Sequence, residues 1–478
     1  MSHPERQRPS VTLAVLALGA MSYSLLQSGV APALPEIQHS LHTSETGASW
    51  VFTAYLLSAS VGTPILGRLG DMYGKEKWLL VTLGGLAAGT LLAALASSLW
   101  LLILARVIQG FGGGIFPLAF GIVRDEFPRE RVAGAIGLLS ALLGIGGGLG
   151  VVAAGVIVNS LDYHWLFWIP LVAIVAAAIL TWRLVPESPI RVPGRVNWLA
   201  ALLMAAGLST VLVAVSQTSR WGWGSPKTLG LMAAGLGVLA LWTAHELRSR
   251  DPLVDMRMMR LPGVWTTNLA ALLLGAGMFS SFILIPQFVE TPMADGFGFG
   301  ASITGGGLFL LPATVMLMVV GSLAGRVAAR FGSKWALVAG SGFAMVSFAL
   351  LLLRHGEPWD FYVSAALLGV GIGLAFAAMG NLIVEAVPPE QTGVATGMNT
   401  VLRTVGGALG AQIGATLIAG NVVRGHPTVH GYSLAFLVST LALGLGILAA
   451  LAVPDRPRAR GRAGPDPAAA GELSPDAV

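Results

Sequence analysis

Residues 47–97 read GASWVFTAYLLSASVGTPILGRLGDMYGKEKWLLVTLGGLAAGTLLAALAS, two long apolar runs joined by a short charged loop. A helix satisfies its own backbone hydrogen bonds, so about 20 apolar helical residues can cross the roughly 30 Å hydrocarbon core of a bilayer. Each run has about the length needed for one crossing. The stretch therefore predicts a pair of transmembrane helices connected by a tight turn outside the hydrocarbon.

The same pattern continues along the whole chain. Of its 478 residues, 55% are hydrophobic and only 11% are charged, against roughly 25% charged residues in an ordinary soluble protein. The first apolar run follows Arg6 and Arg8, as in a secretory signal, but it is longer than a signal core and many runs follow, so we interpret it as the first helix. The runs lie near residues 11–33, 47–67, 78–97, 100–123, 133–158, 164–184, 197–216, 228–246, 264–288, 302–325, 335–353, 359–384, 396–419 and 432–453. They predict an all-α polytopic membrane protein with 14 transmembrane helices.

The positive charges predict the orientation. Lys and Arg residues in short loops are retained on the cytoplasmic side of a membrane. With the N-terminus inside, 22 of the 28 Lys and Arg residues fall in cytoplasmic segments. The six others are Arg220, Lys227, Arg354 and Arg424 in outer loops, and Arg106 and Arg403 within predicted spans. We therefore expect a multi-pass protein of the plasma (inner) membrane with both termini in the cytoplasm.

The chain also repeats itself. The loop GRLGDMYGK at residues 67–75 is echoed 258 residues later by GRVAARFGSK at residues 325–334. Such a repeat indicates two related halves, as in transporters whose binding site lies between pseudo-symmetric bundles. The spacing requires two extra helices between the halves. We predict an N-terminal six-helix bundle at 1–184, a linker with two additional transmembrane helices at 185–262, a C-terminal six-helix bundle at 263–453 and a disordered cytoplasmic tail at 454–478.

With these features the sequence resembles the major facilitator superfamily, specifically its fourteen-helix drug:proton antiporter branch, over nearly the whole chain. The signature loop of the superfamily is matched by Gly67, Arg68, Gly70, Asp71, Gly74 and Lys75, and its degenerate copy is Gly325, Arg326 and Gly332. The resemblance implies that this loop is a conformational latch, in which Asp71 pairs with Arg124 at the cytoplasmic end of the fourth predicted span, near 100–123. Alternatively, these charges only fix the topology.

Two arginines fall inside apolar runs. The fourth predicted span reads LxxxRxxQGxGGG over residues 102–114, which is similar to the second motif of the branch. Residues 399–407 read NxxxRxxGG, which resembles a later motif of the branch. A guanidinium near the bilayer centre is costly unless it faces partners or water. The resemblance makes Arg106, Gln109 and Arg403 polar groups of a central cavity that handle protons or substrate. A structural hydrogen-bonding role is the alternative for Arg106, and equally for Arg403, which we include as a second cavity candidate because it is buried in a corresponding way.

The fifth predicted span, near 133–158, has glycines at the spacing of the antiporter motif of the branch. They are Gly137, Gly146, Gly150 and Gly155. Small residues along one stripe let helix backbones approach and pivot. Two positions depart from the motif, since Val151 replaces its proline and Ala154 replaces one of its glycines. Helix packing without a transport role is the alternative.

Helix 1 lacks the aspartate that this branch usually places midway along it, and no Asp or Glu lies in the middle of any predicted span. A proton-coupled carrier needs a group whose protonation changes between states. Coupling would then use Glu290 near the outer end of the ninth predicted span, at 264–288, or Asp71 or another relay. The polar residues along the expected cavity are Tyr23, Gln27, Tyr55, Asn268, Gln287, Asn381, Asn399 and Gln412. As a set they favour neutral or weakly anionic amphipathic substrates, although each of them alone can equally be an interhelical hydrogen-bonding residue. The absence of a central anion disfavours lipophilic cations.

Enzymes and ATP-driven pumps are disfavoured. The chain has no cysteine, its histidines are scattered mainly in loops, and its glycine-rich run at 110–114 lacks the Lys-Ser/Thr end of a phosphate loop. We therefore expect no metal, no cofactor and no nucleic-acid partner. The predicted function is a monomeric secondary active transporter that exports small amphipathic molecules or drugs by proton antiport with alternating access. An uncoupled facilitator or a lipid or metabolite flippase of the same fold is the main alternative, and a non-transporting sensor is a third.

Overall fold

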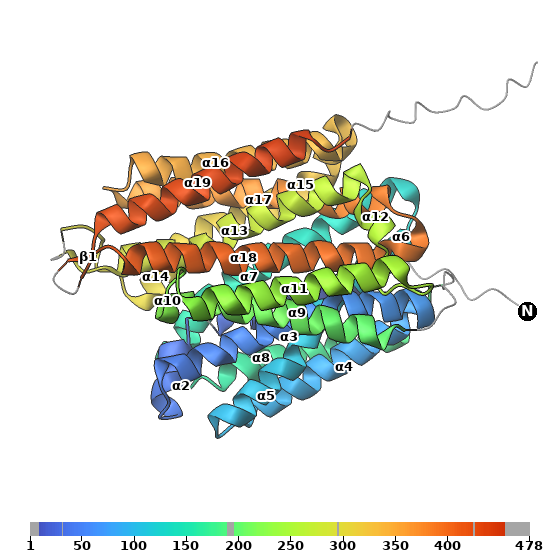
Figure 1. Ribbon diagram of the computed structural model, residues 1–478, viewed down its shortest axis with the longest axis horizontal. Coiled ribbons are helices and arrows are strands. Elements are labelled where there is room, and N and C mark those ends of the chain that lie inside the picture. The colour runs from blue at the N-terminus through green and yellow to red at the C-terminus, as the bar shows by residue number, and fades with distance from the viewer. Residues whose placement is uncertain (1–8, 31, 189–195, 294–295, 424–425, 455–478) are drawn as a thin grey trace, which may run out of the picture.

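The computed structural model describes residues 9–30, 32–188, 196–293, 296–423 and 426–454. Within these residues the chain is almost entirely helical (Figure 1). The predicted tail lies outside the described residues apart from its first residue, Pro454, as does part of the predicted linker at 189–195.

Fourteen helices of the described chain are long and apolar enough to cross a membrane, which confirms the predicted fold class and the number of spans. The long helices are α1 (Pro9–Gly29), α3 (Glu45–Tyr73), α4 (Lys75–Ala94), α5 (Leu99–Gly110) continued by α6 (Ile115–Glu126), α7 (Arg129–Ser160), α8 (Trp165–Leu184), α9 (Trp198–Ser216), α11 (Pro226–Arg248), α13 (Pro262–Glu290), α15 (Leu311–Phe331), α16 (Ser333–Leu353), α17 (Pro358–Ala386), α18 (Thr392–Ala419) and α19 (Val429–Leu451). The short elements are α2 (Leu34–Ser40), η1 (Phe111–Gly114), α10 (Thr218–Trp221), α12 (Met256–Met259), α14 (Ile303–Phe309), η3 (Pro389–Gln391) and an antiparallel ribbon of β1 (Val422–Val423) and β2 (His426–Pro427).

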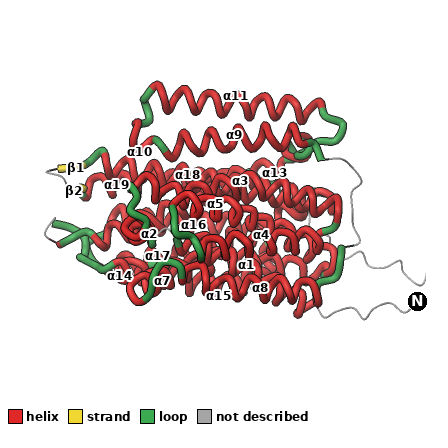
Figure 2. The backbone as a smooth tube through the Cα atoms, turned by 90° about the horizontal axis from the view of Figure 1, so that it is seen from below, coloured by secondary structure: helices red, strands yellow, loops and turns green. Residues whose placement is uncertain are grey.

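The long helices form two halves that lie side by side. Helices α1 to α8 make the N-terminal half, and helices α13 to α19 make the C-terminal half. The halves meet where α3 packs on α18 and where α7 packs on α15 and α17. Helices α9 and α11 pack against each other at one side of the molecule (Figure 2), and α9 touches both α3 and α18. The inserted pair therefore lies over the α3–α18 contact, while the residue boundaries of the three predicted units stay a prediction.

A separate hydrophobic cluster attaches the inserted pair to the C-terminal half. Met204 of α9 and Trp242 of α11 belong to the same cluster of buried residues as Ile383 of α17 and Met398 of α18. The carboxylate of Glu246 accepts hydrogen bonds from the Trp242 indole and from the backbone N–H groups of residues 253 and 254. The loop that follows α11 is thereby held against this cluster.

Two glycines make the same turn at corresponding places in the two halves. Gly74 joins α3 to α4 with φ of 116°, and Gly332 joins α15 to α16 with φ of 93°. Glycine adopts such positive φ values at no steric cost because it has no Cβ. The repeat seen in the sequence is thus a repeat of backbone structure. We call the end of the molecule that holds these two turns the basic end.

The predicted fourth span is not one continuous α-helix. It is interrupted by the 3₁₀ turn η1 in the glycine run. A Cβ on Gly112 would come within 2.8 Å of the Tyr23 ring, and one on Gly113 would overlap the Thr63 hydroxyl. The glycine run therefore lets α1 and α3 approach the middle of this span.

Candidate functional site

A small cavity lies between the two halves. Tyr23 and Gln27 of α1 and Thr63 of α3 line it from the N-terminal half, and Met278 of α13 and Arg403 of α18 line it from the C-terminal half. Its volume is about 20 Å³, which is room for roughly one water molecule. Drug-sized ligands occupy pockets of about 300–1,000 Å³. The structure therefore shows a closed arrangement, and a substrate can enter only when the halves separate.

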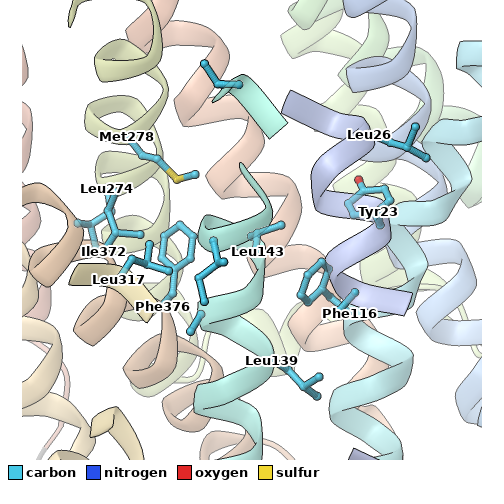
Figure 3. Packing of buried hydrophobic residues seen from close by; sticks show 14 of the residues in the cluster. Tyr23, Leu26, Phe116, Leu139, Leu143, Leu274, Met278, Leu317, Ile372 and Phe376 are labelled. Atoms are coloured by element: carbon cyan, nitrogen blue, oxygen red, sulfur yellow. The ribbon is translucent and has the colours of Figure 1, made fainter. Parts of the chain in front are cut away.

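A cluster of buried apolar and aromatic side chains surrounds this cavity (Figure 3). Leu143 of α7 lies between Phe116 and Tyr23 of the N-terminal half and Phe376 and Met278 of the C-terminal half. All five side chains belong to one cluster of buried residues. Within this apolar surrounding, the polar residues that line the cavity are able to select a ligand, and they are Tyr23, Gln27, Ser60, Thr63, Thr400, Arg403 and Thr404.

Arg403 is the charged residue of the cavity wall. Its side chain stacks over the Phe376 ring, with 4.5 Å between Cζ and the ring centroid, and the residue is 9% exposed. Among the described residues, no hydrogen bond or ion pair to its guanidinium is formed. A cation–π contact stabilises by about 0.5–2 kcal/mol, whereas an arginine near a bilayer centre costs at least about 2.5–3.5 kcal/mol. The ring alone does not offset the cost of placing this cation here.

Arg106 has a different environment from the one predicted. It is fully buried, and it donates from Nε to the Val51 carbonyl at 3.1 Å and from Nη1 to the Leu26 carbonyl at 3.3 Å and the Gln109 side chain at 2.8 Å. Its Cζ lies 4.0 Å from the centroid of the Tyr55 ring. It does not line the cavity. These contacts join α1, α3 and α5, so the alternative of a structural hydrogen-bonding residue fits Arg106 better.

The structure spreads the eight predicted substrate-binding residues over several environments. Tyr23 and Gln27 line the cavity, and Tyr55 is buried beside Tyr23 with 5.8 Å between ring centroids. Asn399 donates to Asn268 at 2.9 Å across the α13–α18 contact, so these two amides hold helices of the same half together.

The remaining predicted polar residues lie away from the cavity lining. Asn381 donates to the Ala133 carbonyl at the start of α7 at 3.4 Å. Gln287 is exposed on α13, and Gln412 is half-buried on α18. Glu290, the proposed coupling group, is half-buried at the end of α13, where its carboxylate lies against Gly306 of α14.

At the basic end, Asp71 binds the start of a helix of the opposite half. Its carboxylate accepts hydrogen bonds from the backbone N–H groups of Gly393 at 3.4 Å and Val394 at 3.2 Å, in the first turn of α18. The residue is 1% exposed. The first N–H groups of a helix lack partners within the helix and carry a partial positive charge, so they favour an anion. Asp71 therefore acts as an anionic cap for a helix of the other half.

Arg124 also reaches the C-terminal half, at a separate place. From the end of α6 it donates to the carbonyl oxygens of Val387 at 3.0 Å and Pro388 at 3.2 Å, and to the Thr392 hydroxyl. The expected Asp71–Arg124 ion pair is not formed. A cation at carbonyl groups that follow a helix C-terminus is as favourable as an anion at its N-terminus. Arg124 therefore binds the chain at the end of α17, while Asp71 binds the start of α18.

The ion pairs of this region stay within the N-terminal half. Lys75 is 1% exposed and lies 2.6 Å from Asp125 and 3.7 Å from Asp71. Asp125 also accepts a hydrogen bond from Ser188. This network orients the Asp71 carboxylate. It was not predicted from the sequence because Asp125 and Ser188 lie 54 and 117 residues from Asp71.

Glycine pairs allow the halves to touch at the basic end. A Cβ on Gly67 of α3 would lie 2.5 Å from the Gly393 carbonyl oxygen, and one on Gly325 of α15 would lie 2.5 Å from the Cα of Gly134 in α7. The degenerate loop therefore repeats the close glycine contact of the first loop. It does not repeat the acid, since the position equivalent to Asp71 is Ala329 in the sequence. Only one of the two contacts has a charged cap.

Helix α7 presents its glycines to both halves. Gly146 and Gly150 face α1, where a Cβ would meet Ser24 and Ser28. Gly148, between them, faces Thr314 of α15, and the predicted motif glycines Gly137 and Gly155 face residues 377 and 304 of the C-terminal half. The motif thus supplies both packing within a half and a smooth surface between halves.

Hydrogen bonds join the two halves at the basic end. In the described part of the chain they involve Asp71, Arg124 and Asn381. The other contacts between the halves there are glycine and apolar packing. This is the arrangement expected of a gate that is closed at the basic end.

The fold and these sites match a known family. The profile of the Major Facilitator Superfamily matches residues 16–411 and, in an overlapping second match, residues 321–476. The chain belongs to the major facilitator superfamily. This membership accounts for the two halves, the cavity between them and the repeated loop, and it makes the chain a multi-pass membrane transporter rather than an enzyme.

Similar superfamily members have roles in resistance. The tetracenomycin C resistance and export protein of Streptomyces glaucescens is 29% identical over 82% of this chain and 73% of its own length. Multidrug resistance protein Stp of Mycobacterium tuberculosis is 27% identical over 81% of this chain and 72% of its own length. The human organic anion transporter MFSD10 superposes with a TM-score of 0.67 over 94% of this chain at 16% identity, which shows the fold alone. The likenesses to the two resistance proteins confirm the predicted relationship to drug efflux transporters of the superfamily.

Proposed function

We propose that this transporter exports small amphipathic molecules, drugs among them, across the plasma (inner) membrane by alternating access coupled to proton antiport. The observation that carries the proposal is the set of hydrogen bonds that joins the halves at the basic end, together with a cavity that both halves line. The relatives named for drug resistance and export support the direction of transport.

The latch follows from which contacts change when the halves separate. Contacts that exist in only one state bias the equilibrium between states. The bonds of Asp71 and Arg124 cross between the halves, so they stabilise the state that is closed at the basic end. The Lys75–Asp125 ion pair lies within one half and persists in both states. The concentration of Lys and Arg at this end supports a cytoplasmic location for it and for both termini.

Asp71 is also the favoured proton-coupling group. No Asp or Glu of the described residues lines the cavity. A carboxylate that caps a helix loses most of its attraction for the N–H groups when it is protonated. Protonation of Asp71 would therefore weaken the latch, whereas deprotonation would restore it. Glu290 is the second candidate, because it is half-buried at the opposite end of α13.

An uncoupled facilitator or a flippase of the same fold is the alternative function. Its support is the lack of a carboxylate on the cavity wall, since a central acid is the simplest coupling group. The latch would operate in the same way in such a protein. The two functions differ only in whether flux follows a proton gradient.

Purified protein in liposomes separates them. We would impose a pH gradient and follow one anionic, one neutral and one cationic fluorescent dye, with wild type, Asp71→Asn and the matched control Glu76→Gln from the first turn of α4. Uphill dye movement that follows the gradient in wild type and Glu76→Gln, and is lost in Asp71→Asn, is the expected result. Flux that ignores the gradient would establish the facilitator instead. No flux of any dye would contradict the export proposal.

A further inference from the structure

Arg403 is a buried cation that faces the cavity without a counter-charge. Its only described side-chain partner is the Phe376 ring, and the residue lines the cavity from α18. A buried charge is normally paired or hydrogen-bonded. The guanidinium therefore has donors available for a group that enters the cavity.

The surroundings of the cavity are positive. Arg106 lies behind Tyr23 and Tyr55 in the N-terminal half and is likewise without an ionic partner among the described residues. No described carboxylate lines the cavity to balance the two cations. In an interior of low dielectric, such an imbalance favours an anionic ligand and disfavours a cationic one.

The rest of the wall fits an aromatic body. Tyr23, Phe116 and Phe279 contribute rings, and Thr63 and Thr400 contribute hydroxyl groups. Flat apolar ligands pack well against such rings, whereas the hydroxyl groups can bind polar substituents. A guanidinium is the side chain that binds a carboxylate through two parallel hydrogen bonds.

We propose that the substrates of this transporter include amphipathic aromatic anions, whose carboxylate pairs with the Arg403 guanidinium while the ring occupies the aromatic wall. The cavity is too small for such a molecule in the closed arrangement, so binding accompanies separation of the halves. This inference rests on the proposed export function for its physiological meaning, but the binding itself can be tested without transport.

Helix α18 connects this site to the latch. Its first turn is capped by Asp71, and Arg403 lies ten residues after Gly393 on the same helix, about 15 Å along the helix axis. A movement of α18 that releases Asp71 therefore also moves the guanidinium. Binding of an anion at Arg403 and the state of the latch are therefore linked through α18.

The test compares three naphthalenes that differ in charge. Binding of 2-naphthoate, 2-naphthylmethanol and 2-naphthylmethylammonium to the purified full-length protein is measured by thermal shift and by equilibrium dialysis in a neutral detergent. We expect wild type to bind the carboxylate at least about tenfold more tightly than the neutral alcohol, since a charge-assisted hydrogen bond contributes about that factor. Arg403→Gln should lose this preference. Arg403→Lys should keep part of it, and Arg354→Gln, an exposed arginine of the same half, should keep all of it.

Several results would overturn the proposal. They are equal binding of the three naphthalenes by wild type, an undiminished carboxylate preference in Arg403→Gln, or binding of phosphatidylglycerol alone, which would assign the site to a lipid headgroup. If Arg403→Gln does not fold, the comparison of probes in wild type and Arg403→Lys decides. Transport of neutral and cationic dyes without carboxylate binding would refute this inference and leave export intact. Carboxylate binding lost in Arg403→Gln, with no transport of any dye, would refute export and leave the site intact.

Discussion

Replacing Asp71 by Asn tests the latch most directly, because the change removes a charge and almost no volume. The wild-type carboxylate accepts two backbone hydrogen bonds across the halves, at 3.2 and 3.4 Å. Hydrogen bonds to a charged group contribute about 1.5–3 kcal/mol each, and neutral ones about 1 kcal/mol. The side chain of Asn has one oxygen to accept and an NH₂ group that cannot pair with N–H donors.

The magnitude follows from counting only the contacts that change between states. The Lys75–Asp71 ion pair lies within one half, so it drops out of the difference. The two distances are at the long end of the normal range, so we take the lower value for each bond. The closed state should lose about 2 kcal/mol, which shifts the opening equilibrium by roughly 30-fold.

The chain contains no cysteine, which makes the assay clean. A single Ser60→Cys on α3, a residue of the cavity wall that is 2% exposed, reports whether the cavity is open. Labelling by a membrane-impermeant maleimide from the basic end, in inside-out vesicles, should be slow in the wild-type background and about 30-fold faster with Asp71→Asn. Glu76→Gln, which removes a carboxylate from the first turn of α4 with no described contact to the other half, should not change the rate. Transport should fall while the amount inserted in the membrane stays the same.

The latch reasoning would fail if Asp71→Asn left both the labelling rate and transport unchanged. It would also fail if Glu76→Gln accelerated labelling as much, because the effect would then belong to the charge of this region and not to the α18 cap. Faster labelling from the opposite end alone would show that the hydrogen bonds do not hold the basic end closed.

The remaining predictions concern packing and stability. Gly148→Ala should slow transport at least several-fold, since its Cβ would overlap Thr314 across the halves, whereas Gly147→Ala, whose Cβ would have 3.7 Å to its nearest neighbour, should transport normally; equal rates in the two variants would refute a role for this surface. Glu246→Ala should destabilise the protein by about 2–4 kcal/mol, because it leaves the two backbone N–H groups at 253–254 unpaired. Thermal unfolding in detergent checks this, and an unchanged melting temperature would contradict it.

The number of spans and the repeat could be predicted because they depend on local sequence. Each apolar run is long enough to be identified as a span from its own residues. The turns at Gly74 and Gly332 likewise depend on only a few residues of each loop. The interruption at η1 was not predicted, because a glycine run is compatible with a continuous helix until its neighbours are known.

The roles of the buried polar residues could not be predicted in the same way. Arg106 and Arg403 have the same appearance in the sequence, yet one binds backbone carbonyls and the other lines the cavity. Transmembrane helices are apolar all round, so periodicity does not indicate which side faces the centre. The partners are also distant, since Asn268 and Asn399 are 131 residues apart and Asp71 is 323 residues from Val394. Such contacts follow from the packing of the two halves and not from any local pattern.

The two contacts between the halves differ in a way that makes α18 the moving part of this mechanism. Both have a close glycine pair, but only the α3–α18 contact has an acid, and the matching position on α15 is Ala329. A charge that can be neutralised therefore acts on α18 and not on α7. Since α18 also presents Arg403 to the cavity, one helix carries the groups that would respond to the proton and to the anion. Opening moves both groups together, so the protonation of Asp71 and the binding of an anion at Arg403 are linked through the same helix.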